Sequence, residues 1–392
     1  MPDIIQSSLS SRRARQAANI ALQAALVVVV GGLAYAAGHH AARNLANAHI
    51  TSGFGFWNNT AGFDISQTLI DYSSSTSTFG RAFLVGLLNT LLVAGIGIVL
   101  ATVLGFAVGI ARLSHNWLVA HLAGGYIELI RNVPLLLQIL FWYNAVLKSL
   151  PQLRGSVKIP GGGLLNNRGL YLPRPEFAAG FGYVLSALVF GIAATIVLRM
   201  WVHRRQDRTG RPIRVVWPAL GLIVVLPALV YLLAGAPLSF NFPQLGRFNV
   251  IGGVEILPEF AALLLALTVY TAAFIAEVVR AGVMAVPHGQ TEAAQALGLR
   301  SPTMLRFVVV PQAMRVIIPP LTSQYLNLIK NSSLAVAIAY PDLVQVFTGT
   351  VLNLTGHAVE IVAITMAVYL FISLVTSLLM NAYGYAIAAE ER

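Results

Sequence analysis

GQTEAAQALG, at residues 289–298, is separated by nine residues from Val308 and Val310–Pro311. The stretch is rich in small and polar residues and ends in glycine, which is typical of a short helix. Long apolar segments lie on both sides of it. A polar helix between membrane spans is a place where an integral membrane protein meets a water-soluble partner.

Local residue chemistry predicts where this helix starts and stops. Pro287 can open it, because its missing N–H would have no partner in the first turn. Gly298 can adopt the left-handed conformation that ends it. Ser301–Pro302 then suits the cap and first residue of a following helix.

Alanines and one leucine give the same helix a smooth face. By the i, i+3, i+4 rule, Ala293, Ala296 and Leu297 share a face from which Glu292 is offset. Another protein can approach such a face closely. An ordinary helical loop that packs on its own membrane domain is an equal alternative on these residues alone.

Composition indicates a membrane protein. Hydrophobic residues make up 57% of the chain and charged residues 10%, against about 25% charged in an average soluble domain. Cysteine is absent, which excludes disulfides and thiolate metal sites. The net charge of +11 comes from arginines scattered between apolar blocks, and this pattern does not suit nucleic-acid binding.

Apolar runs predict about eight membrane helices, since one crossing needs about 20 apolar residues. Five runs contain no Lys, Arg, Asp or Glu: Arg15 to Arg43, Arg81 to Arg112, Glu176 to Arg199, Arg214 to Arg247, and Glu360 to Glu390. Three further segments, about 118–148, 259–285 and 314–340, carry charges within them. The first run exceeds the length of a signal-peptide core and lacks a clear cleavage pattern, so we expect a retained helix.

Charged residues within the three interrupted segments should face protein or water rather than lipid. Glu128 with Arg131, and Glu277 with Arg280, have i, i+3 spacing and are expected to neutralise each other. Lys330 has no carboxylate within four residues. Together with Gln324, Asn327 and Asn331 on the same helix, it is a candidate for lining a pathway or bonding a partner subunit.

Prolines predict bends. Pro134 should bend the third helix, and Pro311, Pro319 and Pro320 should kink or break a later one. Segment 302–340 is about 58 Å long as a helix, against a membrane core of about 30 Å. We therefore expect an in-plane or tilted cytoplasmic piece up to about residue 314, followed by a span.

The distribution of basic residues predicts the orientation. Cytoplasmic N- and C-termini place fifteen basic residues inside and eight outside, in line with the positive-inside rule. Half of the eight outer basic residues lie in loop 149–177, where Gly161–Gly163 predicts a flexible turn. Helices at 178–199 and 215–234, joined by a basic loop, are expected to face lipid at the periphery. In loop 39–81, Phe54, Phe56 and Trp57 are expected at the headgroup level, with ligand binding as the alternative.

Several motifs together resemble one family. EAAQALG with Val308 and Val310–Pro311 resembles the EAA loop of binding-protein-dependent ABC importer permeases, although Val308 and Val310 stand where the pattern prefers Ile and Leu. Four segments resemble the polar amino acid subfamily of these permeases: IELIRNVPLLLQILFWY at 127–143, TAAFIAEVVRAGVMAVPHGQ at 271–290, PQAMRVIIPPL at 311–321 and LIKNSSLA at 328–335. The resemblance covers roughly 82–148 and 259–390. The length, the extra first helix and the inserted helix pair resemble the larger permease of a general L-amino acid transport system.

This resemblance implies an all-α, polytopic fold with a MetI-like permease core and a cytoplasmic coupling helix. Its parts would be an N-terminal helix and outer loop (1–81), the first part of the core (82–148), outer loops with the inserted helices (149–258), and the second part of the core with the coupling loop (259–392). The implied coupling residues are Gly289, Glu292, Ala293, Ala294 and Gly298.

The resemblance also implies partners. These would be two cytoplasmic ATP-binding subunits, a second permease subunit, for which the resemblance favours a paralogue over a second copy of this chain, and a periplasmic amino acid binding protein, all at the inner membrane. No G-x-x-x-x-G-K-[ST] sequence occurs in the chain, so ATP hydrolysis is expected on another chain. No cofactor, metal or catalytic residue is expected here.

Two other functional classes compete with this reading. A secondary transporter driven by an ion gradient also has charged, proline-broken helices, but it has no use for the Glu292 element. A membrane enzyme needs a convergent acid, base or metal set, and the eight histidines show no metal-ligand spacing. The sequence does not define the range of substrates.

Overall fold

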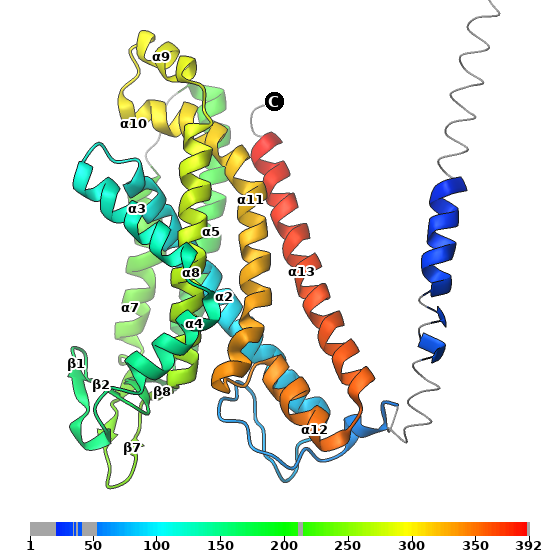
Figure 1. The fold of residues 1–392 in the computed structure, drawn as a ribbon. Helices are drawn as coiled ribbons and strands as arrows, with labels where there is room; N and C mark the ends of the chain where they lie inside the picture. The colour runs from blue at the N-terminus through cyan, green and yellow to red at the C-terminus, as the bar shows by residue number, and fades with distance from the viewer. Residues whose placement is uncertain (1–20, 34, 37, 41–52, 211–214, 390–392) are drawn as a thin grey trace, which may run out of the picture. The chain divides into compact units, whose positions relative to one another are not determined.

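The computed structural model describes residues 21–33, 35–36, 38–40, 53–210 and 215–389 (Figure 1). Within these residues, seven helices are long and apolar enough to cross a membrane, or eight if one bent pair counts as a single span. This count and the mostly helical chain confirm the predicted fold class. Expectations for Arg12, Arg13, Arg15, Arg43, Arg211, Arg214, Arg392 and the 41–52 part of the first loop lie outside the described residues.

The chain divides into two compact units, and the boundaries fall within two long helices. One unit is Leu100–Ala276, and the other combines the described residues up to Val99 with those from Glu277 onward. The boundary helices are α2 (Phe79–Arg112) and α8 (Pro258–Met284).

In the unit Leu100–Ala276, a break at Pro134 bends one span by 103°. The span consists of α3 (Trp117–Asn132), α4 (Leu135–Leu140) and the π-helical η2 (Phe141–Leu147). Proline has no N–H and disfavours helical geometry in the preceding residue, and Val133 is indeed extended (φ −102°, ψ 127°). The predicted bend is confirmed.

Gln138 stabilises this break. Its buried side chain donates through Nε2 to the carbonyl oxygens of Ile130 at 2.9 Å and Val133 at 3.0 Å. These are carbonyl groups for which a broken helix leaves no backbone donor. A single amide side chain thus satisfies both groups.

Helices also form the inserted pair. α5 (Phe181–Thr209) packs against a second helical segment made of α6 (Val216–Leu220), the π-helical η4 (Gly221–Val225) and α7 (Leu226–Leu233). The helix α5 ends at Thr209, ten residues beyond the predicted end at residue 199, so the basic residues from Arg199 to Arg208 are helical rather than in a loop. Most of the aliphatic side chains of the pair are exposed, as expected for lipid-facing helices.

Short strands replace the predicted outer loops. β1 (Val157–Ile159), β2 (Gly163–Asn166), β3 (Gly169–Leu172) and β8 (Val254–Ile256) form an antiparallel sheet in that order. Two strand pairs accompany it, β4 (Arg174–Phe177) with β5 (Leu238–Asn241), and β6 (Gln244–Leu245) with β7 (Val250–Ile251). We call residues 151–177 and 234–257 the β subdomain. The predicted glycine turn is confirmed, since Gly161 and Gly162 have φ of 90° and 84° between β1 and β2.

The other unit includes the candidate span Ala21–His40, which agrees with the predicted first helix. From residue 53 it has η1 (Gly55–Asn58) and the first part of α2, and it continues after α8 with α9 (His288–Ala296) and α10 (Ser301–Met304). The π-helical η5 (Leu305–Val309) leads into α11 (Val310–Asn331), and the 3-10 helix η6 (Ser332–Ile338) follows. The unit ends with the π-helical η7 (Val344–Val351), α12 (Leu352–Thr355) and α13 (Ala358–Ala389), and α13 packs along α11.

The long segment after α9 changes direction between α10 and α11, as the yellow and orange ribbons show (Figure 1). This agrees with the prediction of a separate piece before the span, although the span begins a few residues earlier than predicted. The helix α11 continues through Pro319 and Pro320, so of the two predicted effects, a kink or a break, the break is wrong. Pro311 falls in the first turn of α11, where a missing N–H costs nothing.

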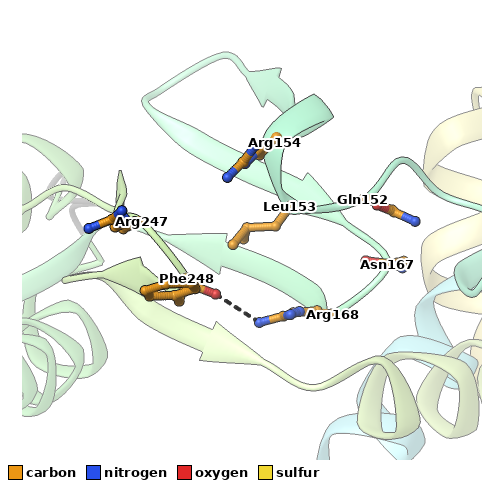
Figure 2. Close-up of a pocket in the computed structure, with 7 residues that line it drawn as sticks. All are labelled: Gln152, Leu153, Arg154, Asn167, Arg168, Arg247 and Phe248. Atoms are coloured by element: carbon orange, nitrogen blue, oxygen red, sulfur yellow. Dashed lines mark hydrogen bonds between the residues drawn. The ribbon is translucent and has the colours of Figure 1, made fainter.

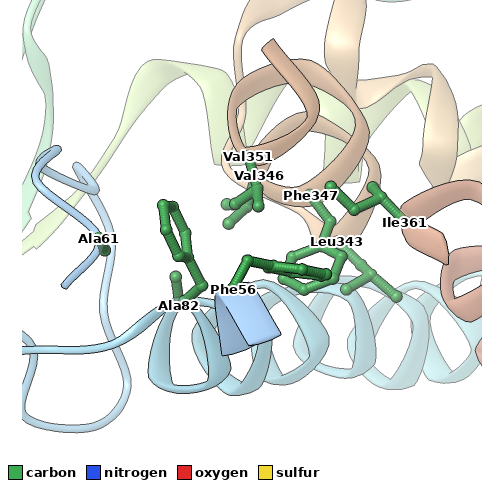
Figure 3. Close-up of a cluster of buried hydrophobic side chains, with 9 residues drawn as sticks. Phe56, Ala61, Ala82, Leu343, Val346, Phe347, Val351 and Ile361 are labelled. Atoms are coloured by element: carbon green, nitrogen blue, oxygen red, sulfur yellow. The ribbon is translucent and has the colours of Figure 1, made fainter. Parts of the chain in front are cut away.

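A cluster of buried apolar side chains holds the first loop in place (Figure 3). Phe56 is 3% exposed and packs with Phe79, Leu343 and Phe347, while Trp57 packs against the edge of the cluster. The expectation of headgroup-level aromatics was therefore wrong for Phe56, whereas for Phe54 and the half-buried Trp57 it stays a prediction. Short stretches of loop sequence do not reveal whether an aromatic ring meets lipid or its own chain.

Candidate functional site

The predicted coupling helix is present as α9, with its ends within one residue of the predicted positions. Pro287 precedes its first residue in an extended conformation. Gly298 is left-handed, with φ 72°. Its N–H donates to the Gln295 carbonyl oxygen at 2.8 Å, and the N–H of Leu299 donates to that of Ala294 at 3.1 Å. This pair of bonds is a Schellman-type helix end, which requires the left-handed residue.

One side of α9 is attached to the protein's own chain. Ala294 is 4% exposed. Gln290 Oε1 accepts a hydrogen bond from Gln312 Nε2 at 3.3 Å. Ala294 and Gln290 are each two positions from Glu292. At 3.6 residues per turn, Glu292 therefore lies about 160° around the helix from each of them.

The opposite side of α9 is exposed and carries the helix's one charged residue, Glu292. Gly289, Ala293 and Ala296 are also exposed, and Leu297 is 80% exposed. Glu292 makes no hydrogen bond or ion pair with the described residues. The outward side therefore offers one carboxylate among small residues, with an apolar edge at Leu297.

The segment before α9 is packed closely against α11. A Cβ on Gly282 would lie 2.3 Å from Ile317 Cγ1 and 3.3 Å from the Ala313 carbonyl oxygen, so only glycine fits. One turn earlier, Arg280 Nη2 pairs with Glu277 Oε1 at 2.6 Å, which confirms the predicted neutralisation. The helix end that leads into α9 is thus in close contact with α11.

The other predicted pair does not form. Arg131 places its guanidinium over the ring of Phe274, 5.1 Å from the ring centroid, and not against Glu128. Cation–π contacts of this kind are favourable. The i, i+3 spacing alone did not distinguish between these two partners.

Lys330 lies at the edge of a cavity of about 350 Å³, here called the Lys330 cavity. Its lining is mostly apolar and consists of Lys330, Ser333, Val344, Thr348, Val362, Thr365, Met366 and Tyr369. Lys330 and Asn327 are exposed, whereas Gln324 and Asn331 are half-buried. Of the four predicted residues, the structure brings only Lys330 to this cavity.

A buried polar network, which was not predicted from the sequence, joins α2 to the segment that follows η6. Asn89 Nδ2 donates to the carbonyl oxygens of Gln67 at 2.9 Å and Pro341 at 2.8 Å. Thr90 Oγ1 accepts from the Leu343 N–H at 3.0 Å. Asn89 and Thr90 are adjacent polar residues in a charge-free span. Their position in the sequence is the feature from which a buried polar contact could have been predicted.

Asp342 extends this network between two candidate spans. Its Oδ1 accepts from the Gln345 N–H at 2.8 Å, and its Oδ2 accepts from Tyr369 Oη at 3.2 Å. Burial raises the pKa of Asp342 to about 7, against the lowering effect of these hydrogen bonds. The two hydrogen bonds of Asp342 connect the start of η7 to α13.

Comparison with known proteins gives consistent relatives. The family model of binding-protein-dependent transport system inner membrane components matches residues 187–388. The general L-amino acid transport system permease protein AapQ of Rhizobium johnstonii is 53% identical over 374 residues, covering 95% of this chain and 93% of that protein. The putative amino-acid ABC transporter permease protein YhdX of Escherichia coli is 54% identical over 369 residues, covering 94% and 93%.

A third relative is less similar but still matches over most of its length. The glutamate/glutamine/aspartate/asparagine transport system permease protein BztB of Rhodobacter capsulatus is 41% identical over 370 residues, covering 86% of each chain. Relatives of this kind exclude the alternative of a secondary transporter. The chain belongs to the binding-protein-dependent transport system inner membrane component family, and it is a multi-pass permease subunit of an ABC importer.

Proposed function

We propose that this permease imports L-amino acids across the inner membrane. It acts in an assembly with two cytoplasmic ATP-binding subunits, a second permease that is a paralogue, and a periplasmic amino acid binding protein. The relatives support this substrate class, since two are named for amino acid transport systems and a third for an amino-acid transporter. ATP hydrolysis belongs to a separate subunit, as in other members of the family.

The observation that carries the coupling role is the two-sided geometry of α9. Glu292 and Ala293 contact the ATPase from the exposed side, with Gly289 allowing close approach at the first turn. Ala294 anchors the helix to its own chain, and Gly298 ends it. Closure of the ATPase then displaces α9, and the close contact at Gly282 passes the displacement to α11.

The proposed orientation has cytoplasmic N- and C-termini, with α9 in the cytoplasm. The spanning helix α8 starts two residues after β8 and ends four residues before α9. A helix of this length crosses the membrane once, so β8 and α9 belong to opposite sides. The chain contains no cysteine. Glu292→Cys should therefore react with a membrane-impermeant thiol reagent only in inverted vesicles, and Lys158→Cys only in intact cells with a permeable outer membrane. The reverse pattern would overturn this orientation.

The Lys330 cavity is proposed to lie on the translocation pathway or at the interface with the paralogous permease. Lys330→Arg and Lys330→Met separate the two roles in reconstituted transporter. A pathway role raises the KM for uptake while the assembly purifies intact. An interface role reduces recovery of the paired permease and leaves the KM of the surviving complex unchanged.

Reconstitution tests the function as a whole. The four types of subunit are co-expressed, purified and placed in liposomes, and radiolabelled amino acids are supplied with the binding protein. We expect uptake that requires ATP on the side of the membrane where the ATP-binding subunits lie. Uptake should also fail without the binding protein. Uptake driven by a proton gradient in the absence of the ATPase would contradict the proposal.

A further inference from the structure

Three arginines from separate parts of the β subdomain surround one hollow of about 520 Å³ (Figure 2). We call it the arginine basin, and its lining is Gln152, Leu153, Arg154, Asn167, Arg168, Arg247 and Phe248. All three arginines are exposed. Figure 2 shows Arg154, Arg168 and Arg247 on different sides of Leu153.

The fold holds two of these arginines in defined places. Arg168, in the turn between β2 and β3, donates through Nη1 to the Phe248 carbonyl oxygen at 3.1 Å and to Asn249 Oδ1 at 2.8 Å. Arg247 lies over the ring of Phe248, 5.7 Å from its centroid. These contacts connect the β2–β3 turn to the β6–β7 turn and bring together arginines that are 79 residues apart in sequence.

No carboxylate lines the arginine basin. The two carboxylates of the β subdomain are engaged elsewhere, because Glu176 accepts from Asn241 Nδ2 at 2.9 Å and Glu255 accepts from Tyr171 Oη at 2.7 Å. Positive charge is also disfavoured on the outer side of a membrane protein. Membrane orientation therefore does not explain why these arginines are present.

We propose that the arginine basin is a docking surface for exposed carboxylates of the soluble binding protein. This inference rests on the proposed function, in which such a protein delivers substrate on the side of the β subdomain. Guanidinium groups recognise carboxylates with two parallel hydrogen bonds. Each exposed pair is weak by itself, so a rigid acidic protein face that makes several contacts at once fits this basin better than one small free anion. The summed charge also speeds association.

A charge-matched comparison tests the proposal. The variant Arg154→Gln with Arg247→Gln removes two charges from the basin but leaves Arg168, whose hydrogen bonds connect the two turns. The control Lys158→Gln with Arg174→Gln removes two charges from the same subdomain outside the basin. The affinity of the binding protein for the intact transporter in neutral-lipid nanodiscs is measured by biolayer interferometry, at low and at high salt.

We expect the basin variant to bind about tenfold more weakly than the control, which is about 1.4 kcal/mol. The loss should lie mainly in the association rate and should shrink at about 1 M salt, where charges are screened. Equal affinities for the two variants would overturn the inference, and so would a difference that appears only in nanodiscs containing anionic lipid. Failure of the unmodified transporter to bind or to use any binding protein would instead refute the proposed function.

Discussion

Replacing Glu292 with alanine tests the proposed coupling surface directly. Glu292 is exposed and makes no hydrogen bond or ion pair with the described residues. Such surface substitutions change folding stability by no more than about 0.5 kcal/mol. The melting temperature of the purified permease should therefore stay almost constant.

Association with the ATPase should change much more. A hydrogen bond to a charged group contributes about 1.5–3 kcal/mol, which corresponds to a loss of affinity of about 10- to 150-fold. Glu292→Gln keeps an acceptor oxygen without the charge, so its loss should be intermediate. Gln290→Ala is the matched control, because this side chain lies on the side of α9 that bonds Gln312.

The assay measures binding of the purified ATPase to the permease in nanodiscs, together with ATP hydrolysis stimulated by the binding protein. Glu292→Ala should weaken binding and abolish stimulation at moderate ATPase concentrations, and excess ATPase should restore it. The reasoning is refuted if Glu292→Ala binds the ATPase as tightly as the parent, or if Gln290→Ala weakens binding by the same factor.

Three stability predictions follow from other contacts, each checked by thermal melting in detergent. Gly298→Ala should destabilise the folded permease by about 1–2 kcal/mol, because alanine is strained at φ 72°. Gly289→Ala has open space around its Cβ and should instead stabilise α9 by about 1 kcal/mol. Equal shifts in the melting temperatures of the two variants would contradict this. Gly282→Ala should destabilise by about 1–3 kcal/mol through overpacking against Ile317, and an unchanged melting temperature would show that the helices separate easily. Because the pKa of Asp342 is raised by burial from 3.8 to about 7, the folded chain keeps a proton that the unfolded chain loses, and stability falls as the pH rises through that window. Asp342→Asn removes this fall, so its melting temperature relative to the parent should be higher at pH 8 than at pH 4; a constant difference would disprove the titration.

Features encoded by neighbouring residues could be predicted from the sequence. The span count followed from apolar runs, the ends of α9 from Pro287 and Gly298, and the 103° bend from Pro134. In each of these cases the responsible residue acts on its own backbone or on the next turn. The Glu277–Arg280 pair belongs to the same class, since the partners are one turn apart.

Features that depend on distant partners could not be predicted. Strands of two to four residues, such as β6 and β3, show no useful alternation, and β3 pairs with β8 more than 80 residues away. Phe56 is buried in a cluster whose other members include Phe347, from a remote helix. The arginine basin likewise forms only when two separate turns meet.

Asn89 has a consequence for how the chain is made. The acceptor of its 2.8 Å bond is the Pro341 carbonyl oxygen, 252 residues later. Ribosomes add about 5–20 residues per second, so this amide enters the bilayer some tens of seconds before its final acceptor exists. Until then the Gln67 carbonyl oxygen is the earlier of its two acceptors, and because an unsatisfied N–H in hydrocarbon is unfavourable, the second N–H must find temporary partners in water, lipid headgroups or the insertion machinery. The polar network of this span can therefore be completed only after residue 341 has been made, long after the span itself.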